Sequence, residues 1–308
     1  MLDKLTAKSV NKGCIMVFAT YLDKNGSECV GVLSPDRKFI YSIAELGFAV
    51  QTMRELIAGY SVQLCESLQI KIETAQNGVA LEDIKLLSPI PHPHHDLLCV
   101  GKNYVEHAQE GAQYNGVVYE KPKLPVYFCK RVDCAVGHEG DIPSHSKITS
   151  KLDYEAELAV VIGKTCSNVS EDEVNDYIFG YTIANDVSAR DLQYAHIQFT
   201  FGKSLDGFSP IGPWIVTADE FTFPPKLQIK ARVNGELRQN DNTGNLIFGI
   251  PRIISELSQG ITLEPGDILL TGTPSGVGLG FQPPKFLSPG DIVECEIEKI
   301  GLLRNTVR

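Results

Sequence analysis

Two glutamates, Glu155 and Glu157, are separated by a single residue in a segment with the composition of a β-strand. Because side chains alternate along a strand, both carboxylates would project from one face and lie close together. Like charges side by side repel, and the residues that follow, 158–162, are all apolar, so the strand enters a core that an unpaired carboxylate cannot share. The pair is therefore either a cation site or a solvated strand edge before the apolar run begins.

A third carboxylate, Asp186, follows the strand-like run 178–183 and precedes a predicted helix at 189–197. Ser188, with Asp191 three residues later, has the pattern of a capping box at the start of that helix. Asp186 would then lie at a strand-to-helix corner, where its side chain either faces a pocket or bonds its own backbone. Three carboxylates together would form an all-oxygen site, which suits Mg²⁺ or Mn²⁺ better than Zn²⁺.

A histidine and a glutamate, His107 and Glu110, stand three residues apart in a segment that could form a short helix. On a helix they would share a face and could form a hydrogen bond. A carboxylate that orients an imidazole makes a general base that works near neutral pH. The alternative is a surface turn with two solvated polar side chains.

The elements that must position these residues are mainly strands. From residue 97 onward, strand-like runs recur between Gly, Pro, Asn and Asp turns, and convincing helices are few and short. This pattern favours a β-rich α+β fold, a barrel or stacked sheets, over a doubly wound α/β fold. The expected strands are 98–100, 125–128, 155–162, 178–183, 214–216, 227–233, 267–270 and 292–297, and the expected helices are 171–177, 189–197 and 251–257.

Residues 1–90 are predicted to form a small N-terminal α+β module, and residues 91–308 the domain that carries the candidate site. Within the module, strands are expected at 16–22 and 28–33, and helices at 43–56 and 61–70. A Pro- and His-rich segment, 87–96, separates the two parts. Because the prolines between its histidines fix an extended backbone, we interpret this segment as a linker rather than a metal site.

The composition is that of an ordinary globular protein, with 43% hydrophobic and 21% charged residues. A formal net charge of −10 without a basic run argues against nucleic acid or a membrane surface as partner, so an anionic substrate needs local positive charge. Eight scattered cysteines without a secretory signal predict reduced thiols and a cytoplasmic protein. The apolar run 14–22 is too short to span a bilayer and is expected to be a strand.

Four motifs in one order closely resemble the fumarylacetoacetate hydrolase family. They are Glu-x-Glu at 155–157, Gly-Tyr-Thr-x-x-Asn-Asp-Val-Ser-Ala-Arg-Asp at 180–191, Gly-Lys-Ser at 202–204 and Leu-Thr-Gly-Thr-Pro-Ser-Gly-Val-Gly at 270–278. The likeness covers about residue 95 to the C-terminus. It implies rolled mixed sheets, a homodimer, and one Mg²⁺ or Mn²⁺ per subunit held by Glu155, Glu157 and Asp186.

The same resemblance implies roles for residues around the metal. His107 and Glu110 would be a catalytic pair on a mobile lid, and Lys203 a catalytic cation that stabilises an oxyanion. Arg190 and Asp191 are expected to be structural and to tie their helix down. The substrate is expected to contact Gln193, Thr273, Lys102 and Lys130.

The activity expected from the resemblance is hydrolysis of a C–C bond in a small 2-oxo or 1,3-diketo acid, of the acylpyruvate or fumarylacetoacetate type, through a metal-bound enolate. We favour hydrolysis because the His-x-x-Glu pair could activate water. The same site could serve an oxaloacetate-type decarboxylase or an isomerase or tautomerase of 2-hydroxy-dienoates, since these reactions share the enolate. A protein that binds oxo-acids without catalysis is the alternative from another class.

Overall fold

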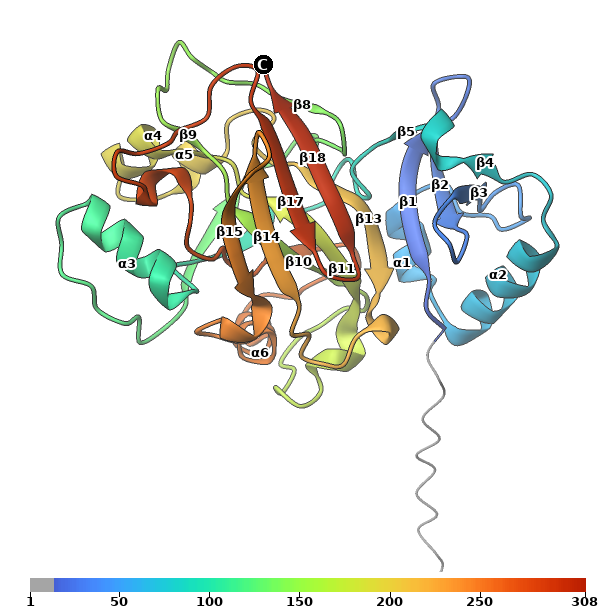
Figure 1. Ribbon diagram of the computed structural model, residues 1–308. Helices are drawn as coiled ribbons and strands as arrows, with labels where there is room; N and C mark the ends of the chain where they lie inside the picture. Colours follow the sequence, from blue (N-terminus) through green and yellow to red (C-terminus); the bar gives the residue numbers. More distant parts are fainter. Residues whose placement is uncertain (1–13) are drawn as a thin grey trace, which may run out of the picture.

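A small lobe of strands and two helices stands beside a larger β-rich body in the computed structural model, which describes residues 14–308 (Figure 1). The expected strands at 16–22 and 28–33 are confirmed, while the first thirteen residues of the predicted module lie outside the described range. The lobe consists of β1 (Val17–Leu22), β2 (Glu28–Leu33), β3 (Phe39–Ser42), β4 (Val79–Ala80) and β5 (Lys85–Leu86), with α1 (Met53–Ala58) and α2 (Val62–Thr74).

The first helix of the lobe is much shorter than the predicted 43–56. It begins at Met53, where Thr52 accepts a hydrogen bond from the Glu55 amide and Glu55 completes a capping box. The apolar spacing upstream belongs to an irregular segment that buries Ile43 and Leu46 without forming a helix. The second predicted helix, 61–70, is confirmed as α2.

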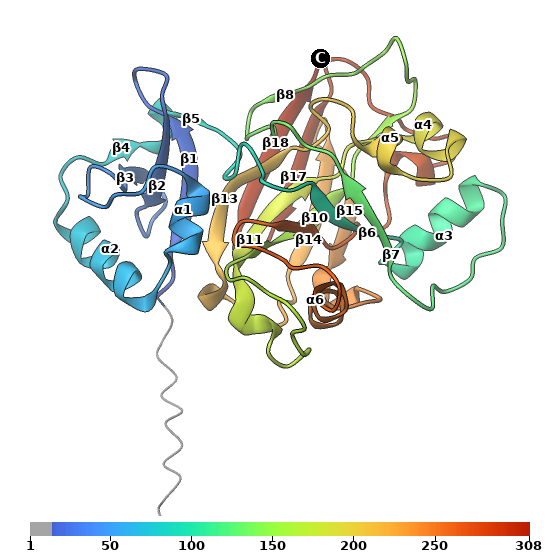
Figure 2. The ribbon, with the colours of Figure 1, turned by 180° about the vertical axis from the view of Figure 1, so that it is seen from behind.

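One long sheet crosses from the lobe into the body, in the order β4-β3-β2-β1-β13-β11-β10-β16-β6-β7, with β5 paired to β1. Strand β1 pairs antiparallel with β13, with Val17 opposite Val216, so the lobe extends the sheet of the body. Figure 2 shows β6 and β7 at the other end of this sheet. Its body strands are β6 (Leu97–Gly101), β7 (Val126–Lys130), β10 (Ala156–Ile162), β11 (Ile178–Asn185), β13 (Ile211–Thr217) and β16 (Ile268–Leu270).

A second sheet, in the order β15-β14-β17-β18-β8, packs over β10 and β11 of the first (Figure 1). Its strands bury alternate residues, as Ile229, Ala231 and Val233 of β14 show, and these join Leu158 and Val160 of β10 in one core. The strands are β8 (Asp141–Ile142), β14 (Gln228–Val233), β15 (Glu236–Asn242), β17 (Ile292–Ile297) and β18 (Gly301–Val307).

All eight strands predicted after residue 97 are present, and the β-rich α+β fold with few short helices is confirmed. The segment 171–177, predicted to be an α-helix, contains only a 3-10 turn at Val174–Tyr177. No helix among the described residues is long and apolar enough to cross a membrane. The helices of the body are α3 (Val105–Tyr114), α4 (Arg190–Ala195), α5 (Thr200–Lys203) and α6 (Ile250–Ser258), and a small pair of strands joins β9 (Leu152–Asp153) to β12 (Ser188–Ala189).

The predicted capping box at Ser188 is wrong. Ser188 lies in β12 and its hydroxyl donates to the Asp186 carbonyl at 2.9 Å, while Ala189 occupies the N-cap of α4. Asp191 instead accepts from the Thr149 hydroxyl at 2.6 Å. Ser188 pairs with Asp153 in the short ladder between β12 and β9, and it therefore lies in a strand where the pattern predicted the start of the helix.

The expectation of eight reduced cysteines is also wrong, because Cys14 and Cys65 form a disulfide. These residues are 51 positions apart, and the tertiary fold brings α2 against the segment that leads into β1, with 6.1 Å between the two Cα atoms. Sequence spacing carried no signal of this pair. The other six cysteines are free.

The alternation in β14 predicts how its residues contribute to stability. Replacing Ile229, which is fully buried between the sheets, with Ala should lower the free energy of unfolding by about 2–5 kcal/mol, because it leaves a cavity. Replacing the next residue, Lys230, which faces away from the core, should change it by less than about 0.5 kcal/mol. Urea unfolding followed by circular dichroism would measure both values, and equal losses would contradict this packing.

Candidate metal centre and catalytic site

Three buried carboxylates meet where β10 begins and β11 ends. Glu155 precedes β10, Glu157 lies within it, and Asp186 follows β11. The two strands pair antiparallel with Ala156 opposite Asn185, and the Asp186 amide donates to the Glu155 carbonyl at 2.9 Å. One oxygen from each carboxylate lies within 4.8 Å of the others. The structure therefore excludes a solvated strand edge and places the three side chains predicted as metal ligands in one buried cluster.

Two basic side chains balance the charge of Glu155. Lys203 Nζ lies 2.7 Å from Glu155 and 2.7 Å from Asp186, and Arg190 Nη1 lies 2.6 Å from Glu155. Burial raises the pKa of Glu155, but Lys203 and Arg190 outweigh it and hold that pKa well below its ordinary range. Burial lowers the pKa of Lys203, but Asp186 and Glu155 outweigh burial and leave it above its ordinary value. Lys203 is thus a permanent cation at the centre.

Lys130, expected to contact substrate, contacts Asp186 instead. It is fully buried, with its Nζ 2.6 Å from Asp186 Oδ1 and 2.8 Å from the Val187 carbonyl oxygen. Burial is the main cause that lowers its pKa below the ordinary value for lysine. It is not among the side chains that line the cavity described below. This geometry gives Lys130 a positioning role for Asp186 rather than a contact with substrate.

Glu157 has a different electrostatic environment, because no basic side chain of residues 14–308 forms an ion pair with it. Its Oε2 accepts a hydrogen bond from the Gly272 amide at 2.6 Å. Burial, then the charges of Asp186 and Glu155, raise the pKa of Glu157 well above its ordinary value. A divalent cation between the three carboxylates would remove this repulsion, and an all-carboxylate donor set fits Mg²⁺ or Mn²⁺.

The predicted catalytic pair lies on α3, which Figure 1 shows at the end of the body opposite the N-terminal lobe. His107 Nδ1 stands 3.5 Å from Glu110 Oε2, and neither atom has another partner. Glu110 Oε1 accepts from the Gly276 amide at 2.8 Å, which ties α3 to the loop after β16. His107 lines the same cavity as the three carboxylates. The helix therefore lies beside the centre, and its movement as a lid stays a prediction.

The cavity beneath α3 is small, about 30 Å³, which is room for one or two water molecules. Gln193, Thr273 and Lys102, three of the residues predicted to bind substrate, line it. Gln193 accepts from Arg190 Nη1 at 3.0 Å, and the Thr273 hydroxyl donates to the Ala156 carbonyl at 2.9 Å. An organic acid is larger than this space, and outward movement of α3 would enlarge it.

Two residues, Arg190 and Asp153, belong to this site although the sequence did not predict them as part of it. Arg190, expected to tie its helix down, is buried, lines the cavity and contacts Glu155. Its Nε donates at 2.8 Å to Asp153, which also accepts from the Gly278 amide at 2.6 Å. A signal was present, because Asp153, Glu155 and Glu157 alternate along one run and Arg190 lies one turn of helix from Gln193.

The fold and this site define an enzyme of a known family. Residues 96–308 match the family described as Fumarylacetoacetate (FAA) hydrolase C-terminal. The chain belongs to the fumarylacetoacetate hydrolase family, and the resemblance seen in its motifs is confirmed. Its fold is the fumarylacetoacetate hydrolase-like fold of mixed β-sheets, with a small N-terminal module.

Similar proteins include a tautomerase, a hydrolase and an isomerase. The chain is 48% identical to the oxaloacetate tautomerase YisK of Bacillus subtilis over 228 residues. These residues make up 74% of this chain and 74% of the relative. Among solved structures, a fumarylacetoacetate hydrolase from Exiguobacterium antarcticum is 37% identical with a TM-score of 0.79, covering 95% of this chain and 99% of that one. A 2-hydroxyhepta-2,4-diene-1,7-dioate isomerase from Mycobacterium marinum is 32% identical with a TM-score of 0.71, covering 95% and 98%.

The unbalanced charge of Glu157 predicts how the metal-free protein responds to substitution. Glu157→Gln should raise its melting temperature by several degrees at neutral pH. Without metal, the Glu157 carboxyl must on folding either stay charged beside two other carboxylates or take up a proton, and both cost stability that Gln does not lose. The same variant should lose the stabilisation that Mn²⁺ or Mg²⁺ gives the wild type. Thermal unfolding with and without metal measures both effects, and the exposed Glu171→Gln is the control. A variant that is less stable without metal, yet still stabilised by it, would contradict Glu157 as a ligand.

Proposed function

We propose that the protein is a metal-dependent tautomerase or isomerase of small 2-oxo acids, with oxaloacetate as the first candidate substrate. The named relative at 48% identity is an oxaloacetate tautomerase, and an isomerase is among the similar structures. These comparisons favour the alternative over the hydrolase that we expected first. The His-x-x-Glu pair that suggested hydrolysis serves proton transfer equally well, and tautomerisation needs no attacking water.

The observation that carries this proposal is that His107 and the three carboxylates line one small cavity. When bound there, Mg²⁺ or Mn²⁺ would supply a Lewis acid that polarises a 2-oxo group. In our scheme His107 takes the proton from the carbon next to that group and returns it to the oxygen, or the reverse. Glu110, 3.5 Å from His107 Nδ1, stabilises the imidazolium formed between the two transfers.

Fixed positive charge explains how an acidic protein could hold an anionic substrate. The net charge of the chain is −10, so attraction must come from the site itself. Lys203 and Arg190 already balance Glu155 and Asp186, so the charge that meets an anion would come from a bound divalent ion and from Lys102 at the exposed rim of the cavity. Closure of α3 excludes water, which strengthens these interactions and protects an enol intermediate from side reactions.

Hydrolysis of a C–C bond is the second candidate function. It is supported by the similarity to the fumarylacetoacetate hydrolase from Exiguobacterium antarcticum over nearly the whole chain. The same His107 would then activate water instead of moving a proton between carbon and oxygen. Decarboxylation of oxaloacetate uses the same polarised 2-oxo group but releases CO₂, so products separate the three reactions.

The expected tautomerase activity can be followed by ultraviolet absorbance when enolic oxaloacetate is added to the protein with Mn²⁺ or Mg²⁺. The wild type should accelerate decay of the enol, and His107→Ala should reduce kcat/KM by about 10²–10⁴-fold because the general base is lost. Affinity for Mn²⁺ should not change, since His107 is not among the three proposed ligands. Glu106→Gln, an exposed position on the same helix, is the matched control.

Other results of this experiment would contradict the proposal, and each would point to a different function. Pyruvate and CO₂ released as fast as the enol decays would identify a decarboxylase, and cleavage of acylpyruvates without enol decay would identify a hydrolase. Binding of oxaloacetate without any turnover would favour the non-catalytic binding protein. If His107→Ala kept the wild-type rate, His107 would not be the general base.

A further inference from the structure

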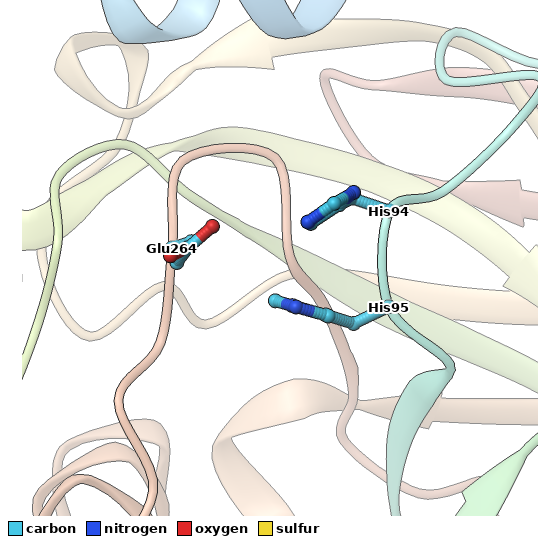
Figure 3. Close-up of side chains that lie close together, drawn as sticks. All are labelled: His94, His95 and Glu264. Carbon is cyan, nitrogen blue, oxygen red and sulfur yellow. The ribbon is translucent and has the colours of Figure 1, made fainter.

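A second cluster of possible metal ligands lies away from the catalytic centre. His94 and His95 follow the last proline of the 87–96 segment, and Glu264 lies in the loop that leads into β16. Figure 3 shows both imidazole rings projecting across a gap towards Glu264. One possible ligand atom from each of the three residues lies within 4.8 Å of the others. The two rings are adjacent, with 4.5 Å between their centroids.

The orientation of His95 is fixed by a carboxylate behind it. His95 Nδ1 lies 2.8 Å from Asp267 Oδ1, and Asp267 is almost fully buried. The other oxygen of Asp267 accepts from the Glu264 amide at 2.8 Å, so one buried side chain holds both the ring and the loop. When Nδ1–H donates to a carboxylate, the lone pair of Nε2 is free to bind a metal. This carboxylate–histidine arrangement is the usual support of a metal-binding imidazole.

The remaining ligands are accessible. His94 forms no hydrogen bond with any residue of the described range 14–308, and its side chain is exposed. Glu264 pairs with Arg54 of α1 at 3.0 Å, but both side chains are about 40% exposed, and exposed ion pairs of this kind contribute little. Glu264 can therefore turn from Arg54 towards an ion at low cost.

We propose that His94, His95 and Glu264 form a binding site for a divalent ion of the Zn²⁺ type, separate from the carboxylate centre. This revises our interpretation of the 87–96 segment as a linker without a metal site, because the ligand from outside the segment, Glu264, is far away in the sequence. Two imidazoles and one carboxylate suit Zn²⁺, and they leave a fourth position for water. Donor atoms around one such ion lie about 3.3 Å apart, given bonds of about 2.0–2.1 Å. Small rotamer changes of exposed side chains close the gap from the observed separation. Mg²⁺ prefers oxygen ligands only, so the two sites differ in chemistry.

The proposed site lies where two neighbouring strands of the long sheet begin. His94 and His95 precede β6, Glu264 precedes β16, and these strands pair in parallel, with Leu269 opposite Leu98. An ion shared by the two entering segments would hold these strand starts together. At their far ends, β16 leads to the Thr271–Gly272 turn against Glu157, and β6 leads to α3. The ion would thus stabilise the two strands that carry the catalytic loops, without taking part in the chemistry.

The experiment is a Zn²⁺ titration by calorimetry of the full-length protein, with excess Mg²⁺ to occupy the carboxylate centre. The wild type should bind one Zn²⁺ that His95→Ala binds at least about 100-fold more weakly, because a ligand is lost. Asp267→Asn should weaken binding by about 10–100-fold through the orientation of His95. His92→Ala is the matched control, since His92 lies in the same segment but its Nδ1 is bound to the Asp133 carbonyl at 2.9 Å.

Two further measurements decide the outcome. Zn²⁺ should raise the melting temperature of the wild type and of His92→Ala, each compared with the same protein without Zn²⁺, but should not raise that of His95→Ala. Co²⁺ in place of Zn²⁺ should give the visible absorption of a four-coordinate site only when both histidines are present. Equal Zn²⁺ affinity in the wild type and His95→Ala, or equal loss in His92→Ala, would overturn the proposal. Activity with Mg²⁺ does not enter this test, so its result is independent of the proposed function.

Discussion

Burial of three carboxylates within 4.8 Å of one another is the constraint on which the rest of the structure depends. Each buried negative charge needs a compensating positive charge or a proton. Lys203, Arg190 and Lys130 supply that charge to Glu155 and Asp186 from three different elements of the chain. The remaining deficit lies beside Glu157 and leaves room for a divalent ion. The metal affinity that we propose would therefore arise from an electrostatic imbalance.

The sheet provides the rigidity that this arrangement requires. β10 and β11 are central strands with fully buried residues, and their register fixes the carboxylates at one end. The loop after β16 then serves both sides of the site. Its Gly272 amide binds Glu157, and its Gly276 amide binds Glu110 of the lid. Because one loop contacts both groups, the position of α3 and the geometry of the carboxylate cluster are physically linked.

One arrangement of residues can serve several reactions of the family. A polarised 2-oxo group and a base above it are needed for tautomerisation, C–C hydrolysis and decarboxylation alike. What differs is the fate of the carbon that carries the charge, which depends on whether water or a proton reaches it. The cavity beneath α3 is small, about 30 Å³, and limited room for water would favour proton transfer. The named relatives include both a tautomerase and a hydrolase, which fits a common site.

The sequence by itself determined the body strands of the long sheet, the family and the three carboxylates of the centre, because these depend on local periodicity and on motifs that lie within single segments. The tertiary structure decided what depends on partners far apart in the chain. It placed Lys130 against Asp186, made Arg190 part of the site, and joined Cys14 to Cys65. Strand β15 was missed because its polar residues, 236–242, are stabilised by pairing with β14 and not by an apolar pattern. Charges and strand edges acquire their partners only when the chain folds, and no spacing rule records which partners those are.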